Sequence, residues 1–187
     1  MKILTLRSLS LALLFLTATL FTSCNLFDKA DDVTFNRTLD QNIAVSETSS
    51  GKDVPYEQEI VLDATTDSEI ERYKDKIKGF EVKKINYTIS SYTGDFSTIF
   101  NGILAFGDEA GSTSNVSATI TNLDLKAAYT AGTVFELTIP ASDVAKVESM
   151  LKDKKAVKVY LTGTLSQTPV SFVMSVTLDV AIQANTL

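Results

Sequence analysis

Carboxylates are the residues of this chain whose types and spacing could do chemistry. Asp63, Asp67 and Glu69 lie close together, and Asp108 is followed by Glu109 in a Gly/Ser-rich stretch. Two carboxylates about 5–10 Å apart in a cleft can hydrolyse a glycosidic bond, and loop carboxylates can bind Ca²⁺. No EF-hand spacing is present and nothing marks a catalytic pair. We expect helix capping at the first group and a solvated turn at the second, with a histidine-free hydrolase as the third alternative for the function.

Most other catalytic chemistry is excluded by composition. The chain has no histidine, no tryptophan and one cysteine, Cys24. Catalytic triads that use histidine are therefore ruled out, and so are zinc sites built from cysteine and histidine. Gly102, Gly107 and Gly111 do not have the spacing of a phosphate-binding loop. We expect no cofactor and no metal site, and we expect that the protein is not an enzyme.

Aromatic residues between 87 and 106 could instead form a ligand-binding face. Tyr92 is the best candidate for an exposed aromatic, because Ser90–Asp95 has the composition of a turn between strands. A glycan or small-ligand site would then lie at loop tips around Tyr92 and Gly107–Gly111. We expect the phenylalanines of this region to fill the core. The aromatic residues are Tyr87, Tyr92, Phe96, Phe100 and Phe106.

Cys24 follows a segment with the three parts of a secretory signal peptide. Lys2 and Arg7 supply a basic start, residues 9–21 are uncharged and largely apolar, and two small residues precede the cysteine. The apolar run is shorter than the ~20 residues that a membrane-spanning helix needs. We expect residues 1–23 to be a signal peptide, with a retained anchor helix or a plain secreted protein as the alternatives.

Thr22-Ser23-Cys24 resembles the lipobox of bacterial lipoproteins, with Phe21 where the family usually has leucine. The resemblance implies that Cys24 receives a diacylglycerol thioether, becomes the N-terminus and is acylated there as well, for example with palmitate. Because one acyl chain binds membranes only marginally, several chains give a stable anchor. The expected partner of Cys24 is therefore the membrane, through this lipid anchor.

We expect residues 24–32 to form an acidic tether after the lipid site. Asn25 differs from the aspartate that retains many proteobacterial lipoproteins at the inner membrane. Lys29, Asp31 and Asp32 resemble, with one interruption, the surface-export signal of Bacteroidota lipoproteins. We expect an outer-membrane lipoprotein, with the cell surface preferred over the periplasmic face. A solvated tether without an export signal is the alternative.

The charge of the remaining chain narrows the class of partner. Lys2 and Arg7 lie in the leader, which has no acidic residue, so residues 24–187 carry fifteen basic and 23 acidic residues and a net charge of −8. This balance argues against nucleic acid, which requires basic patches, and against electrostatic docking on anionic lipid. With Cys24 lipidated, no disulfide can form in the domain, so its stability depends on packing.

Period-two alternation dominates residues 33–187 and predicts half-buried strands. The clearest case is residues 170–184, which we expect to form a long antiparallel hairpin with residues 156–166 through a turn at Thr168-Pro169. Stretches 47–53 and 107–112 have the composition of loops. Further strands are expected at 33–39, 42–46, 56–63, 80–91, 97–106, 114–122 and 133–139.

Two segments have helical spacing instead. Thr66 begins a capping box with Glu69, and the helix that follows is expected to include Ile77 and stop at Gly79. A second helix follows Pro140, with Ser142 as its N-cap. Residues 123–129 are expected to form a short helical turn.

As a whole the chain resembles small β-sandwich lipoproteins of unknown function from the Bacteroidota. The resemblance rests on Thr22-Ser23-Cys24, the acidic stretch after it, and the alternating body with residues 83–89 before Gly94. We expect a mostly β single domain at 33–187, an antiparallel β-sandwich or barrel-like fold with two short helices. Our first hypothesis is a non-catalytic cell-envelope lipoprotein that acts as an interaction or accessory module, with an envelope protein or a glycan as its partner.

Overall fold

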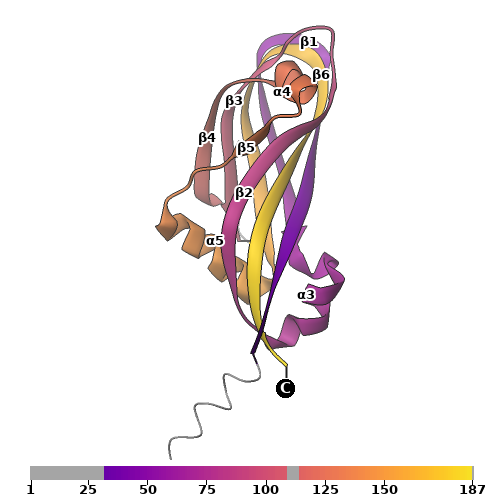
Figure 1. The fold of residues 1–187 in the computed structure, drawn as a ribbon. Helices are drawn as coiled ribbons and strands as arrows, with labels where there is room; N and C mark the ends of the chain where they lie inside the picture. Colours follow the sequence, from indigo (N-terminus) through magenta and orange to yellow (C-terminus); the bar gives the residue numbers. More distant parts are fainter. Residues whose placement is uncertain (1–31, 109–113, 187) are drawn as a thin grey trace, which may run out of the picture. The chain divides into compact units, whose positions relative to one another are not determined.

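The computed structural model describes residues 32–108 and 114–186 (Figure 1). The chain divides into one unit that contains the described ends Asp32–Val33 and Asn185–Thr186, and a second unit, Thr34–Ala184, which holds the core. The second unit is mostly β and antiparallel, which confirms the predicted fold class. The predicted signal peptide, Cys24, Glu109, Gly111 and the tether before Asp32 lie outside the described residues.

Six strands, three α-helices and two 3-10 helices make up the described chain. In sequence order these elements are β1 (Asp32–Asp63), η1 (Ala64–Thr66), α3 (Ser68–Tyr73), η2 (Lys74–Lys76), β2 (Ile77–Thr93), β3 (Ile99–Gly107), β4 (Ser114–Asp124), α4 (Leu125–Ala131), β5 (Val134–Glu136), α5 (Ala141–Lys154) and β6 (Ala156–Asn185).

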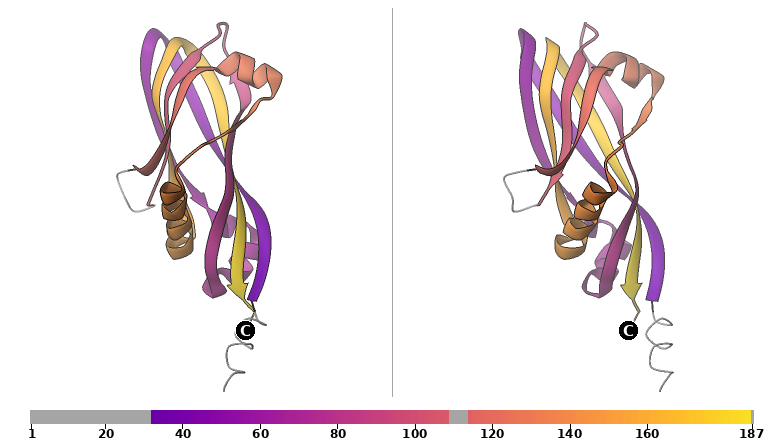
Figure 2. Two further views of the ribbon diagram at one scale, coloured as in Figure 1. Left: turned by 60° about the vertical axis from the view of Figure 1, so that its left-hand side comes forward. Right: turned by 90° about the vertical axis from the view of Figure 1, so that its left-hand side faces the viewer.

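β6 is the central strand of a single curled sheet. Its first half pairs with β3, from Gly107↔Lys158 to Phe100↔Leu165, and its second half pairs with β2. The strand order is β4-β3-β6-β2-β5, and β1 pairs with β6 as well. The long strands bend along their length, so one strand contributes to both halves of the curled sheet (Figure 2). This is the barrel-like alternative of the prediction.

β1 lies alongside β6 on both sides of the bend in β6. The Thr38 hydroxyl donates to Asp179 Oδ1 at 2.6 Å, and the Thr168 hydroxyl donates to the Ser49 carbonyl oxygen at 2.6 Å. Two predictions are therefore wrong: residues 47–53 are part of β1, and 156–184 is one strand rather than a hairpin. Thr168 is buried, and the two halves of β6 pair with different strands, so the Thr168-Pro169 sequence lies in a bent strand.

Both predicted helix caps are wrong, the first by one residue and the second by two. Asp67, not Thr66, caps α3: its Oδ1 accepts the N–H groups of Glu69 at 2.9 Å and Ile70 at 3.0 Å. α5 begins after Pro140 without a side-chain cap, so Ser142 lies inside the helix. The charged carboxylate is a stronger acceptor than the neighbouring hydroxyl.

The predicted helix end is also wrong. α3 and η2 end before Ile77, and β2 begins at that residue, with Gly79 paired to Gln183. The predicted helical turn at 123–129 is present as α4, slightly later in the sequence. The expected strand at 133–139 is shortened to the three residues of β5.

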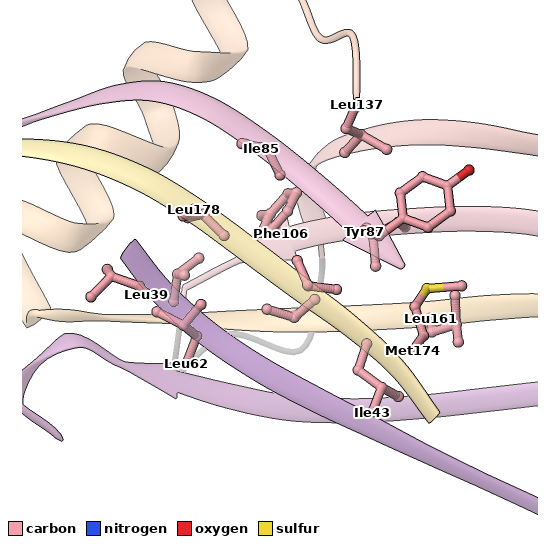
Figure 3. Close-up of a cluster of buried hydrophobic side chains, with 14 of the residues drawn as sticks. Leu39, Ile43, Leu62, Ile85, Tyr87, Phe106, Leu137, Leu161, Met174 and Leu178 are labelled. Atoms are coloured by element: carbon pink, nitrogen blue, oxygen red, sulfur yellow. The ribbon is translucent and has the colours of Figure 1, made fainter. Parts of the chain in front are cut away.

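The core lies between the two halves of the curled sheet. Side chains from β1, β2, β3 and β6 meet there, including Ile43, Ile85, Phe106 and Leu161 (Figure 3). α5 packs against β2, β3 and β4, and α4 packs against β2 and β4, so both helices lie against strands of the sheet. The alternation of β6 is confirmed, because Phe172, Met174, Val176, Leu178 and Val180 are at most 1% exposed.

Candidate functional site

A groove of about 530 Å³ lies between two edges of the sheet. β4 ends the sheet on one side and the short β5 ends it on the other. We call this hollow the seam groove. Its lining residues come from β4 (Thr119–Asp124), α4 (Ala127, Ala128, Ala131), the β5 side (Thr133, Phe135) and β2 (Tyr87).

The β4 wall is shaped by alternation and a bulge. Ile120 and Leu123 are buried, whereas Thr119 and Thr121 are exposed. The register with β3 shifts between Leu123 and Ile120. At this shift Asn122 has a positive φ of 53°, and its N–H donates to Asn101 Oδ1 at 2.7 Å. A bulge of this kind turns side chains out of the regular pleat, here at the lining of the groove.

The α4 wall is fixed by Asp124. Its carboxylate accepts the Ala127 N–H at 2.9 Å and the Ser97 hydroxyl at 2.5 Å. These hydrogen bonds lower the pKa of Asp124 below its ordinary value, and the bond from the Ala127 N–H has the larger effect. The helix ends at Ala131 and is capped by Gly132, which is left-handed with φ 61°. Because the α4 residues that line the groove are alanines, the helix leaves the hollow open.

The opposite wall is aromatic. Tyr87 and Phe135 are a cross-strand pair of β2 and β5, and their rings stack with centroids 5.0 Å apart and an interplanar angle of 13°. Burial raises the pKa of Tyr87, so its hydroxyl stays protonated at neutral pH. The groove thus combines apolar surface with a few hydroxyls and an amide, the usual composition of a binding cleft.

Exposed apolar side chains gather on and next to α4. Phe96, Tyr129 and Val134 are the exposed large hydrophobic residues of the described chain, at 50%, 44% and 61%. Tyr129 lies on α4 and Val134 begins β5. Phe96 precedes Ser97, which bonds the α4 cap, and Thr98, whose carbonyl accepts the Leu125 N–H at 3.0 Å. These three exposed side chains lie on α4, on the segment that follows it, or beside residues that bond it.

Tyr92, the candidate ligand contact from the sequence, lies at the end of β2 and is half-buried. Its hydroxyl donates to the Phe96 carbonyl oxygen and thereby closes the turn at 94–98. A ligand at Tyr92 stays a prediction. The expectation that Phe96 fills the core is wrong, whereas Phe100 and Phe106 are fully buried. Gly107 ends β3, and most of the loop that follows lies outside the described residues.

The clustered carboxylates have structural partners. Asp63 caps η1 by accepting the Thr65 N–H at 2.8 Å, and Asp67 caps α3. Arg37 pairs with Asp67 at 3.4 Å and with Glu69. Asp108 lines a separate cleft with Lys146 and Asp153. Across residues 32–108 and 114–186, no three His, Cys, Asp or Glu residues are grouped to hold a metal ion.

The seam groove was not predicted from the sequence. Its signals are the ten uncharged residues 114–123 and the alanines at 127, 128 and 131. Both are visible in the sequence, but the spatial approach of β4 and β5 is not.

Within the described range, no helix is long and apolar enough to cross a membrane.

Comparison with known proteins gives no family. No family model matches the chain, and no curated protein matches it. One similar solved structure is the decameric BFDV capsid protein, with 12% identity and a TM-score of 0.42 over 80% of this chain and 99% of that one. Another is from Turnip Yellow Mosaic Virus, with 7% identity and a TM-score of 0.34 over 82% and 96%. Neither likeness bears on function.

Proposed function

We propose that this protein is a non-catalytic lipoprotein of the cell envelope, an interaction or accessory module held at the outer membrane by lipid on Cys24. The leader and Thr22-Ser23-Cys24 support the anchor. The seam groove supports the binding role, because a hollow of about 530 Å³, lined by both apolar and hydroxyl side chains, lies beside the exposed Tyr129 and Val134. A module that binds through this surface presents it to partners in the envelope.

A non-catalytic role is consistent with the carboxylates of the described chain. General acid–base catalysis requires a group held near a reacting atom. Asp124, the one acidic residue among the groove's lining residues, is the cap of α4. Asp63, Asp67 and Glu69 serve as caps and as partners of Arg37. These groups stabilise local structure, and the groove contributes contacts for binding.

A glycan is the second candidate ligand. The hydroxyls of Thr119, Thr121 and Thr133 and the amide of Asn122 line the groove beside the aromatic pair. Sugars favour such hydroxyl-rich sites with an aromatic ring. However, Tyr87 is only 6% exposed, so its ring does not offer the open platform on which sugars stack. A polypeptide partner therefore fits the groove better.

Photo-crosslinking in living cells tests the binding role. Benzoylphenylalanine replaces Ala131, which is exposed and lines the groove, and in a control protein it replaces Lys152, exposed on α5 and outside the groove. We expect a discrete adduct from position 131 and none from position 152. Equal adducts from both positions, or none from 131, would contradict the proposal. A protease-resistant adduct would favour the glycan.

A further inference from the structure

We infer that the seam groove accepts one extended polypeptide segment, which pairs with the free edge of β4 and places alternate apolar side chains on the groove floor. This inference rests on the proposed function and names the class of partner. Strand addition of this kind takes its affinity from main-chain hydrogen bonds and its specificity from pockets for alternate side chains.

The first observation is that β4 carries neither charge nor proline over its first ten residues. Natural edge strands carry charges, prolines or bulges that prevent pairing with another chain. β1, an edge of the same sheet, has nine charged residues and Pro55. β4 has no charge and no proline from Ser114 to Leu123, and its bulges lie near its two ends. The contrast within one molecule indicates an edge available for pairing.

The second observation is that the edge adjoins a floor for side chains. Ile120 and Leu123 of β4 line the groove beside Ala128 of α4 and Phe135 of β5. In an added strand successive side chains point to opposite faces. One set would therefore contact this apolar floor, and the other set would lie beside the exposed Thr119 and Thr121. The expected segment alternates apolar and polar residues.

The third observation concerns the size and charge of the occupant. Thr133 and Phe135 of the β5 side line the same groove as β4, so a strand added to β4 would lie between the two edges. A second copy, paired through its own β4, would bring its β3 and β6 with it. Asp124 is the one charged lining residue, and residues 24–187 carry −8. A neutral or cationic segment therefore fits.

A phage-displayed library of random decapeptides tests the inference on the purified full-length protein held in detergent. We expect enriched peptides with alternating apolar and polar residues and no acidic excess. The best peptide is then synthesised with a fluorescent label, and its affinity is measured by anisotropy. Two further versions carry N-methyl groups on one or the other set of alternate amides.

N-methylation separates strand pairing from simple apolar contact. In an added strand only alternate residues direct their N–H groups toward β4. One methylated set should therefore weaken binding at least about tenfold, since several backbone hydrogen bonds are lost, and the other set should change it little. Equal effects of the two sets, or no effect of either, would overturn the inference.

A matched pair of protein variants locates the site. Thr121→Lys adds a charge at the exposed β4 edge, and Gln58→Lys adds the same charge on the exposed surface of β1. We expect Thr121→Lys to weaken peptide binding about tenfold, as lysine blocks edge pairing, and Gln58→Lys to leave it within about twofold. Equal affinities for the two variants would overturn the assignment to β4.

Three outcomes distinguish this inference from the proposed function. If no peptide is enriched while position 131 still forms adducts in cells, the strand inference fails and the binding role stands. If peptides bind at β4 while cells yield no adduct from position 131, the proposed function fails. A dimer that sediments as such and is dissociated by Thr121→Lys would replace the segment with a second copy.

Discussion

Asp124 connects the groove to the turn that follows β2. Its carboxylate caps α4 and also holds Ser97, next to the exposed Phe96. Replacing an N-cap aspartate by alanine costs about 1 kcal/mol. We expect Asp124→Ala to lower the free energy of unfolding by about that amount, whereas Asp124→Asn, which keeps a capping oxygen, loses less. Urea denaturation at neutral pH measures both. A larger loss in the asparagine variant would refute this account of the cap.

The same carboxylate predicts a pH dependence. Its folded-state pKa lies below the ordinary 3.8, because of hydrogen bonds from the Ala127 N–H and then the Ser97 hydroxyl. Such a group stabilises the fold above the unfolded pKa, and the contribution is lost as pH falls through the folded value. Wild type should therefore lose more stability than Asp124→Asn below about pH 4. If the free energy of unfolding fell equally in both proteins as the pH dropped, protonation of Asp124 would not be coupled to folding.

Val176 and Thr177 test the alternation of β6. Val176 is fully buried, whereas Thr177 is partly exposed on the other face. Val176→Asp would bury an unpaired charge, and we expect a loss of several kcal/mol, about 3 or more. Thr177→Asp should cost within about 1 kcal/mol. Thermal unfolding of the two variants measures the difference, and equal losses would mean that both faces of the strand are buried.

At the scale of elements, Gly102 and Gly163 let β3 and β6 approach closely. They face each other in register, and a Cβ on Gly102 would lie 2.1 Å from the Thr162 carbonyl oxygen and 2.6 Å from the Phe100 ring. We expect Gly102→Ala to cost about 2–3 kcal/mol through overpacking. Gly79→Ala is the control, because nothing lies within 4 Å of its Cβ. Similar denaturation midpoints for the two variants would contradict the close packing.

The sequence predicts the individual strands better than it predicts which strands pair with each other. Alternation at 170–184 correctly identified the buried face of β6, because side-chain period depends on local pleat alone. The hairpin was wrong because alternation does not say which strand lies alongside: Val176 pairs with Tyr87, far earlier in the chain. Residues 47–53 have loop composition, yet a side chain from β6 bonds Ser49 within β1.

The site was predicted less well than the fold. The turn composition around Tyr92 predicts an exposed ring there, but the Tyr92 hydroxyl bonds the Phe96 carbonyl oxygen, and Phe96 is the exposed aromatic residue. Local composition does not decide which of two aromatic residues turns outward. The seam groove depends on the approach of β4 and β5. The small alanine side chains of α4 leave the space between these strands unfilled. That approach is a tertiary property, set by how the sheet curls.

At the scale of the whole molecule, stability should depend on packing. The core joins side chains from every long strand, and the chain has no histidine and only Cys24 as a thiol. We expect EDTA and reductant each to leave the thermal midpoint unchanged. Differential scanning calorimetry measures this directly. A drop of more than about 5 °C with EDTA, on the order of 1–2 kcal/mol, would indicate a structural cation site, and Asp63, Asp67 and Asp108 would be examined first.

The central claim is that the domain works on a lipid tether at Cys24. Metabolic labelling with a clickable palmitate analogue, followed by fractionation of the cells, tests it most directly. We predict that the wild-type protein is labelled and lies in the outer membrane, and that Cys24→Ser abolishes the label and moves the protein to the soluble fraction. A Cys24→Ser protein that keeps full labelling and stays in the membrane would contradict the claim.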